Sequence, residues 1–97
     1  MANTAPEIKV ELNHHRFGGK VPVGYRPHFR VGGGEYLGIE VLHASEGVTK
    51  GSAHAVVRLM YWPQVNYDAL CAGASFEVLE SPNIVGNGRV IESRHAI

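Results

Sequence analysis

The sequence predicts an all-β protein, a small closed antiparallel barrel of six strands. Twelve glycines and five prolines in 97 residues interrupt the chain as short strands joined by turns require. Apolar and polar residues alternate with a period of two in several segments, which is typical of strands with one buried face. Closing such strands into a barrel leaves no exposed edge. A two-sheet sandwich is the alternative architecture.

Length and composition indicate one globular domain. With 44% hydrophobic and 19% charged residues, wholesale disorder is excluded. We assign the barrel to residues 7–92 and flexible tails to residues 1–6 and 93–97. No apolar run approaches the ~20 residues that cross a bilayer, and no signal-peptide pattern opens the chain. Cys71 is the single cysteine, so no internal disulfide forms and a reducing cytoplasm is expected.

Alternation and the intervening turn residues define the individual strands. The predicted strands cover residues 7–12, 25–31, 36–43, 53–62, 75–80 and 84–91. In the first, Ile8, Val10 and Leu12 alternate with polar residues. A glycine-containing loop over 14–20 follows, and three consecutive glycines at 32–34 end the second strand, because glycine adopts φ angles that other residues resist.

The later strands carry further signals. Strand 53–62 is the longest, and both of its faces become apolar near its end. Met60 and Trp62 are therefore expected beneath a covering loop or in an exposed contact patch. A tight turn at residues 81–83 precedes the last strand, in which Gly86 and Gly88 predict a bulge or a close backbone approach at a barrel corner.

Several blocks of the chain resemble the C-terminal β-barrel of translation elongation factor Tu. The most specific block is Gly24-Tyr25-Arg26-Pro27-His28-Phe29, and Val85-Gly86-Asn87-Gly88-Arg89-Val90 resembles the family's closing strand. Gly18-Gly19-Lys20 and the segment from Tyr36 to Leu42 match further blocks in the same order. The resemblance spans residues 7–92 and implies a six-stranded barrel standing without the family's GTPase domain.

The resemblance also implies partners. In the family this barrel packs on the GTPase domain, touches the T-stem of aminoacyl-tRNA and binds a nucleotide-exchange protein. Here Ser81-Pro82-Asn83 replaces the family's Gly-Gly-Arg turn, which argues against tRNA binding. GTP binding is excluded, because the chain contains no Gly-x-x-x-x-Gly-Lys-Ser/Thr segment.

Basic residues are concentrated near the N-terminus. No carboxylate occurs between Glu11 and Glu35, and this stretch contains the candidate RNA-binding residues Arg16, Lys20, Arg26 and Arg30. Such a set could bind phosphate or an acidic protein. The favoured alternative is that their counter-charges come from elsewhere in the fold, for example Glu40 for Arg26.

The sequence contains no recognisable catalytic or metal-binding constellation. His14 and His15 are adjacent and point to opposite faces of an extended chain, and a cross-strand metal site including His14 and His28 is the weaker alternative to surface histidines. Cys71 could pair with a histidine as a nucleophile, but a half-buried structural thiol is favoured. We therefore expect no metal, no cofactor and no enzymatic activity.

These observations favour a non-catalytic binding module that recognises a protein partner or a second copy of itself. The candidate contacts are Tyr25, Arg26, His28, Arg30, Met60 and Trp62. The alternative is RNA binding in a translation-related role through residues 14–30. Sequence alone does not name the partner.

Overall fold

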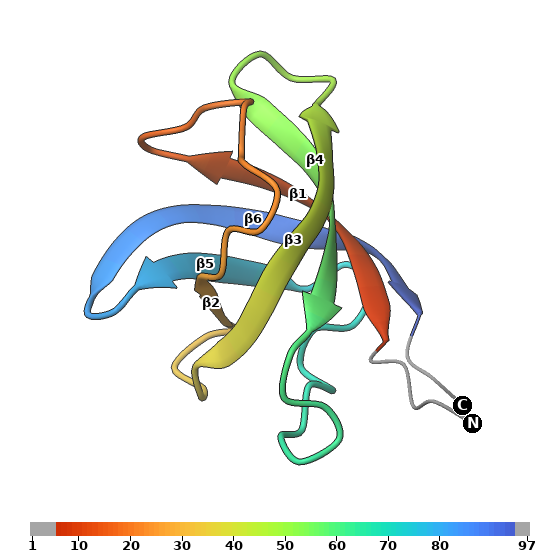
Figure 1. Ribbon diagram of the computed structural model, residues 1–97. Coiled ribbons are helices and arrows are strands. Elements are labelled where there is room, and N and C mark those ends of the chain that lie inside the picture. The colour runs from red at the N-terminus through yellow and green to blue at the C-terminus, as the bar shows by residue number, and fades with distance from the viewer. Residues whose placement is uncertain (1–5, 95–97) are drawn as a thin grey trace.

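The computed structural model describes residues 6–94 and is a closed six-stranded antiparallel β-barrel (Figure 1). The strands are β1 (Glu7–His14), β2 (His28–Arg30), β3 (Leu37–Glu46), β4 (Ser52–Leu59), β5 (Ser75–Glu80) and β6 (Asn83–Arg94). Their order around the barrel is β1-β4-β3-β2-β5-β6, after which β6 pairs with β1. The predicted fold class is thus confirmed. None of the described residues forms a helix long and apolar enough to cross a membrane.

The inward-facing residues of the strands fill the barrel. In β1, Ile8, Val10 and Leu12 are buried while the residues between them are more exposed, as the period of two predicts. The rings of Phe29 and Phe76 stack with centroids 4.0 Å apart, joining β2 to β5 across their pairing. Burial of apolar area at roughly 25 cal/mol per Å² is the main stabilising contribution to such a core.

The second strand is shorter than predicted. Only His28–Arg30 forms β2, whereas the prediction covered residues 25–31. Pro27 has no N–H to donate, but its carbonyl accepts a hydrogen bond from Ile39 at 3.2 Å. The carbonyl of Tyr25 likewise accepts one from Val41 at 2.9 Å. Residues 25–27 therefore run along β3 without forming a regular strand, and β2 itself pairs with both β3 and β5.

The fourth strand ends earlier than predicted. β4 stops at Leu59, and the chain turns, with the N–H of Trp62 donating to the Leu59 carbonyl at 3.3 Å. Tyr61, within this turn, is 50% exposed. The buried Tyr67 anchors the following loop, because its hydroxyl donates to the Gly38 carbonyl at 2.7 Å and accepts from the Tyr61 N–H at 3.1 Å.

The glycine pair in the last strand lies where β6 passes closest to β1. A Cβ on Gly86 would collide with the Asn13 carbonyl, and one on Gly88 with the Glu11 carbonyl. The register of β6 against β1 also shifts between Lys9 and Val10. These findings confirm the predicted close backbone approach.

The boundaries of the barrel differ from those predicted. Pro6 is buried and its carbonyl accepts a hydrogen bond from Leu59 at 3.1 Å, so it is part of the barrel rather than of a tail. β6 continues to Arg94, two residues past the predicted end at 92. The remainder of the two predicted tails, residues 1–5 and 95–97, lies outside the described residues.

Candidate functional site

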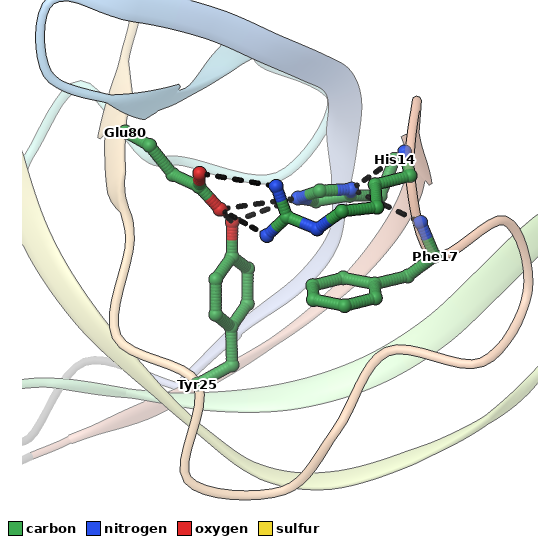
Figure 2. A network of polar contacts seen from close by, with 5 residues as sticks. His14, Phe17, Tyr25 and Glu80 are labelled. Carbon is green, nitrogen blue, oxygen red and sulfur yellow. Dashed lines mark hydrogen bonds and ion pairs between the residues drawn. The ribbon is translucent and has the colours of Figure 1, made fainter.

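A buried histidine organises a polar network at one end of the barrel (Figure 2). His14 ends β1, and its side chain is fully buried. Its Nε2 lies 2.7 Å from the hydroxyl of Tyr25, whose oxygen lies 2.5 Å from Oε2 of Glu80 at the end of β5. Arg16 binds both carboxylate oxygens of Glu80, at 2.8 and 3.3 Å. The network therefore ties the loop after β1 to the end of β5.

The partners of His14 assign its tautomer. Nδ1 accepts hydrogen bonds from the backbone N–H groups of Arg16 at 3.1 Å and Phe17 at 3.3 Å. Because Nδ1 is an acceptor, the proton of the neutral ring sits on Nε2 and is donated to Tyr25. Tyr25 in turn donates its hydroxyl proton to Glu80. Each donor in this chain has an acceptor, which is the condition for a stable buried polar network.

Burial and charge shift the ionisation of all three partners. Burial, together with the nearby Arg16 charge, holds the pKa of His14 below its usual value of 6.5. Hydrogen bonds from Arg16 and Tyr25 lower the pKa of Glu80 to about 2. Burial and the bond to Glu80 raise the pKa of Tyr25 above its usual value. At neutral pH the network consists of a neutral histidine, a neutral tyrosine and an Arg16–Glu80 ion pair, so the 3.7 Å separation of His14 and Glu80 is not a second ion pair.

Aromatic rings enclose the network. The ring of Phe17 lies 4.4 Å from the imidazole of His14 and 5.2 Å from the ring of Tyr25, centroid to centroid. The guanidinium of Arg16 lies 4.5 Å from the Phe17 centroid. These contacts leave the His14 side chain no exposed surface. The imidazole end of the network is thus buried, whereas the Arg16–Glu80 pair lies at the surface, with side chains 57% and 34% exposed.

Three of the four predicted basic residues pair with carboxylates from other segments of the chain. Arg16 pairs with Glu80, Arg26 with Glu40 at 3.4 Å, and Arg30 with Glu77 at 2.8 Å. Lys20 alone of the four candidate RNA-binding residues has no carboxylate of the described residues within ion-pair distance. The expectation that counter-charges come from elsewhere in the fold is confirmed for the three arginines, including the pairing of Arg26 with Glu40.

Sequence reasoning did not select two exposed tyrosines: Tyr36, which precedes β3 and lies beside Arg30, and Tyr61, which follows β4 and lies against Gly38 of β3. Tyr36 is 41% exposed, and its ring centroid lies 5.5 Å from the guanidinium of Arg30 and 5.9 Å from the ring of His28. Tyr61, 50% exposed, lies so close to Gly38 that a Cβ there would collide with its ring. His28 is opposite Gly38 in the β2–β3 register. We call His28, Arg30, Tyr36, Gly38 and Tyr61 the tyrosine–arginine face.

The predicted contact residues thus separate into several environments. His28 and Arg30 belong to the tyrosine–arginine face, whereas the Tyr25 hydroxyl is held in the histidine network. Met60 and Trp62 are partly buried, and Trp62 packs against the core. Tyr36 carried a usable signal, since alternation places it on the face of strand 36–43 opposite the apolar residues Leu37 and Ile39. Tyr61 carried none, since alternation in strand 53–62 groups it with Leu59.

The remaining histidine and cysteine predictions have clear outcomes. His14 is buried and His15 exposed, so the two point to opposite faces as predicted. His28 contacts Tyr36 and lies outside the network of His14. Within residues 6–94, no group of three or more histidine, cysteine, aspartate or glutamate side chains could hold a metal ion. Cys71 is exposed, which corrects the expected half-buried thiol; it lies in the 60–74 loop, outside the strands.

Comparisons with known proteins return no relative. No family model, curated protein or solved structure matches the chain.

Proposed function

We propose that this protein is a non-catalytic binding module that recognises a partner protein through the tyrosine–arginine face. The observation that carries the proposal is the pair of half-exposed tyrosines, Tyr36 and Tyr61, the first of which lies beside Arg30, an arginine already held in position by Glu77. Tyrosine and arginine are enriched at the energetic centres of protein interfaces. The proposal also draws on the resemblance to the elongation factor Tu barrel, which in that family is a contact domain.

The geometry of the face supports recognition with a low entropic cost. Arg30 donates two hydrogen bonds to Glu77, at 2.8 and 3.1 Å, and its guanidinium lies near the Tyr36 ring. The Tyr61 ring rests against Gly38, and Tyr61 adjoins the loop anchored by Tyr67. Side chains held before binding lose less conformational freedom on complex formation.

The charges around the face indicate the chemistry of the partner. Arg26 and Arg58 both bind Glu40, beside the face, and Arg30 binds Glu77. Three arginines therefore accompany these two glutamates, and Glu35, which directly precedes Tyr36 in the chain, supplies a third negative charge nearby. A partner surface that presents apolar or aromatic groups bordered by polar groups of both charge signs would complement this arrangement. We place that partner in the cytoplasm, since a single cysteine is typical of a reducing compartment.

RNA binding has less support from the same residues. An arginine engaged by a carboxylate must give up that bond, or share it, to bind phosphate. This applies to Arg16, Arg26 and Arg30, and Tyr36 and Tyr61 offer stacking surfaces without a free cation beside them. A protein partner uses the tyrosines without breaking the ion pairs.

The test is a pull-down from native lysate, with and without RNase, using the unmodified protein and two variants. Tyr36→Ala and Tyr61→Ala should each reduce recovery of a bound protein at least tenfold, because truncation at an interface centre typically costs 2 kcal/mol or more (about 30-fold). Ile91→Ala is the control: Ile91 is similarly exposed at 45% but lies on β6, which borders β1 and β5.

Gly38→Ala provides a second perturbation of the face. The added methyl would displace the Tyr61 ring, so binding should weaken while both tyrosines remain. A partner that is recovered equally with all variants would contradict the proposal. Recovery that disappears after RNase would favour the RNA hypothesis, and a dimer in gel filtration that dissociates on Tyr61→Ala would identify the partner as a second copy.

A further inference from the structure

The two ends of the barrel carry opposite charge in their loops. Because all neighbouring strands are antiparallel, loops 15–27, 47–51 and 81–82 follow strands of one direction and share one end of the barrel, and loops 31–36 and 60–74 share the other. The first set contains four basic residues and no aspartate or glutamate: Arg16, Lys20, Arg26 and Lys50. The second set contains Glu35 and Asp68 and no lysine or arginine. Glu46 and Glu80, the last residues of β3 and β5, lie at the first end too and reduce its positive charge without cancelling it. An anion is therefore attracted to this end, which we call the basic end.

A cleft of about 270 Å³ opens at the basic end between the loop after β1 and the β3–β4 hairpin. Its lining residues are Phe17, Gly19, Lys20, Glu46, Gly47, Thr49, Lys50, Gly51 and Ser52. Two hydrogen bonds fix the hairpin. The Gly47 N–H donates to the backbone carbonyl of Ser52 at 2.8 Å, and the Ser52 hydroxyl donates to the Thr49 carbonyl at 2.6 Å. The loop wall is fixed through the backbone hydrogen bonds of Gly18 and Lys20. Both walls are therefore built before any ligand arrives.

The two lysines of the cleft have no counter-ion in the described part of the chain. Lys20 and Lys50 are exposed, and none of the described carboxylates lies within ion-pair distance of either ammonium group. Glu46 also lines the cleft, with its Cγ near Gly19, so the local balance is two cations against one anion. Among the other described basic side chains, Arg89 alone shares this lack of a carboxylate partner, and it lies on β6 outside this cleft.

We propose that this cleft binds the phosphate group of a phosphorylated ligand, with Lys20 and Lys50 as the charged contacts. A phosphate monoester carries close to two negative charges at neutral pH, which matches two unpaired ammonium groups contributed by separate loops. Lysine acts as a point charge toward phosphate and needs no bidentate geometry. The site is separate from the tyrosine–arginine face, so the two proposals stand or fall independently.

The test is a titration of the full chain with inorganic phosphate and with O-phosphoserine, followed by NMR of backbone amides. Saturable shifts are expected at Gly19, Gly47 and Gly51, with sodium chloride at matched ionic strength producing none. Lys20→Ala and Lys50→Ala should each weaken binding roughly three- to tenfold, as expected for loss of a charged hydrogen bond at an exposed site. Glu46→Gln should strengthen it roughly threefold by removing the repelling charge.

Arg89→Ala is the matched control, since it removes an equally unpaired positive charge outside the cleft. Unchanged binding in this variant, with weakened binding in the lysine variants, supports the site. Shifts that stay linear, occur equally with chloride or fall equally with Arg89→Ala would mean an adventitious ion only and overturn the proposal. Saturable binding of a short single-stranded RNA without binding of either phosphate probe would also overturn it, in favour of a strand-binding surface.

Discussion

The imidazole Nε2 of His14 lies 2.7 Å from the hydroxyl oxygen of Tyr25, and this contact joins the last residue of β1 to a residue near the far end of the 15–27 loop. The same hydroxyl reaches Glu80 at 2.5 Å, whose carboxylate is also bound by Arg16. The loop that leaves β1 is therefore attached at both ends to the far strand β5. This attachment also shapes the basic end, because Phe17 of the loop contacts His14 and lines the cleft.

Replacing Tyr25 with phenylalanine should destabilise the protein by about 1–3 kcal/mol, because the buried Nε2–H of His14 then has no acceptor. Chemical denaturation followed by tryptophan fluorescence measures this, using Trp62. Tyr36→Phe removes the same hydroxyl from a side chain that is 41% exposed and should change stability by less than about 0.5 kcal/mol. Equal effects of the two variants would mean that the hydrogen bonds of Tyr25 contribute little.

Acidification should lower the free energy of unfolding in two stages. The pKa of His14 is below 6.5 in the folded state, so near this pH the unfolded state binds more protons than the folded state. The free energy of unfolding therefore declines as the pH falls below 6.5. The pKa of Glu80 is about 2 when folded, against 4.5 for the free side chain. Its contribution is complete above pH 4.5 and is lost as the pH falls toward 2.

Urea unfolding between pH 7 and pH 3 measures both stages. His14→Gln should remove the decline that begins below pH 6.5, and Glu80→Gln should reduce the decline below pH 4.5. Both variants are less stable than the parent at pH 7, so the comparison rests on the slope with pH rather than on the absolute value. Slopes identical to the parent in both variants would rule out the network as the source.

Gly88→Ala should destabilise the barrel by about 1–3 kcal/mol or more, as expected when a methyl group is forced into a packed position. Its Cβ would collide with the Glu11 carbonyl and lie 2.7 Å from the Phe76 ring and 2.9 Å from Leu12 Cβ. Gly33→Ala is the control, because no atom lies within 4 Å of its Cβ position. Thermal unfolding should show a clear loss for the first variant and a change within about 0.5 kcal/mol for the second.

Local sequence patterns predict the strands where one face is buried and fail where the chain leaves the ladder. Alternation in β1 corresponds to the observed burial. In β5 it holds as far as Val78, and Leu79 is buried as well where the register against β6 shifts. The prediction for residues 53–62 extends past the true end of β4 because Met60 and Trp62 are apolar, although they belong to a turn. Tyr67, which anchors that turn from outside the strands, gives no periodic signal in the sequence.

The sequence by itself determined the all-β class and most of the strands, since a period of two and frequent glycines depend only on neighbouring residues. The closure of these strands into a barrel rather than a sandwich is seen in the tertiary structure. Only the tertiary structure decided which charged side chains are paired with an opposite charge and which are not. Arg16 and Glu80 are 64 residues apart along the chain, and they meet only because β1 and β5 both flank β6 in the closed barrel. Strand order and register also bring Tyr36 and Arg30 together and leave Lys20 and Lys50 without a carboxylate partner among residues 6–94, because side chains contact one another in space rather than along the sequence.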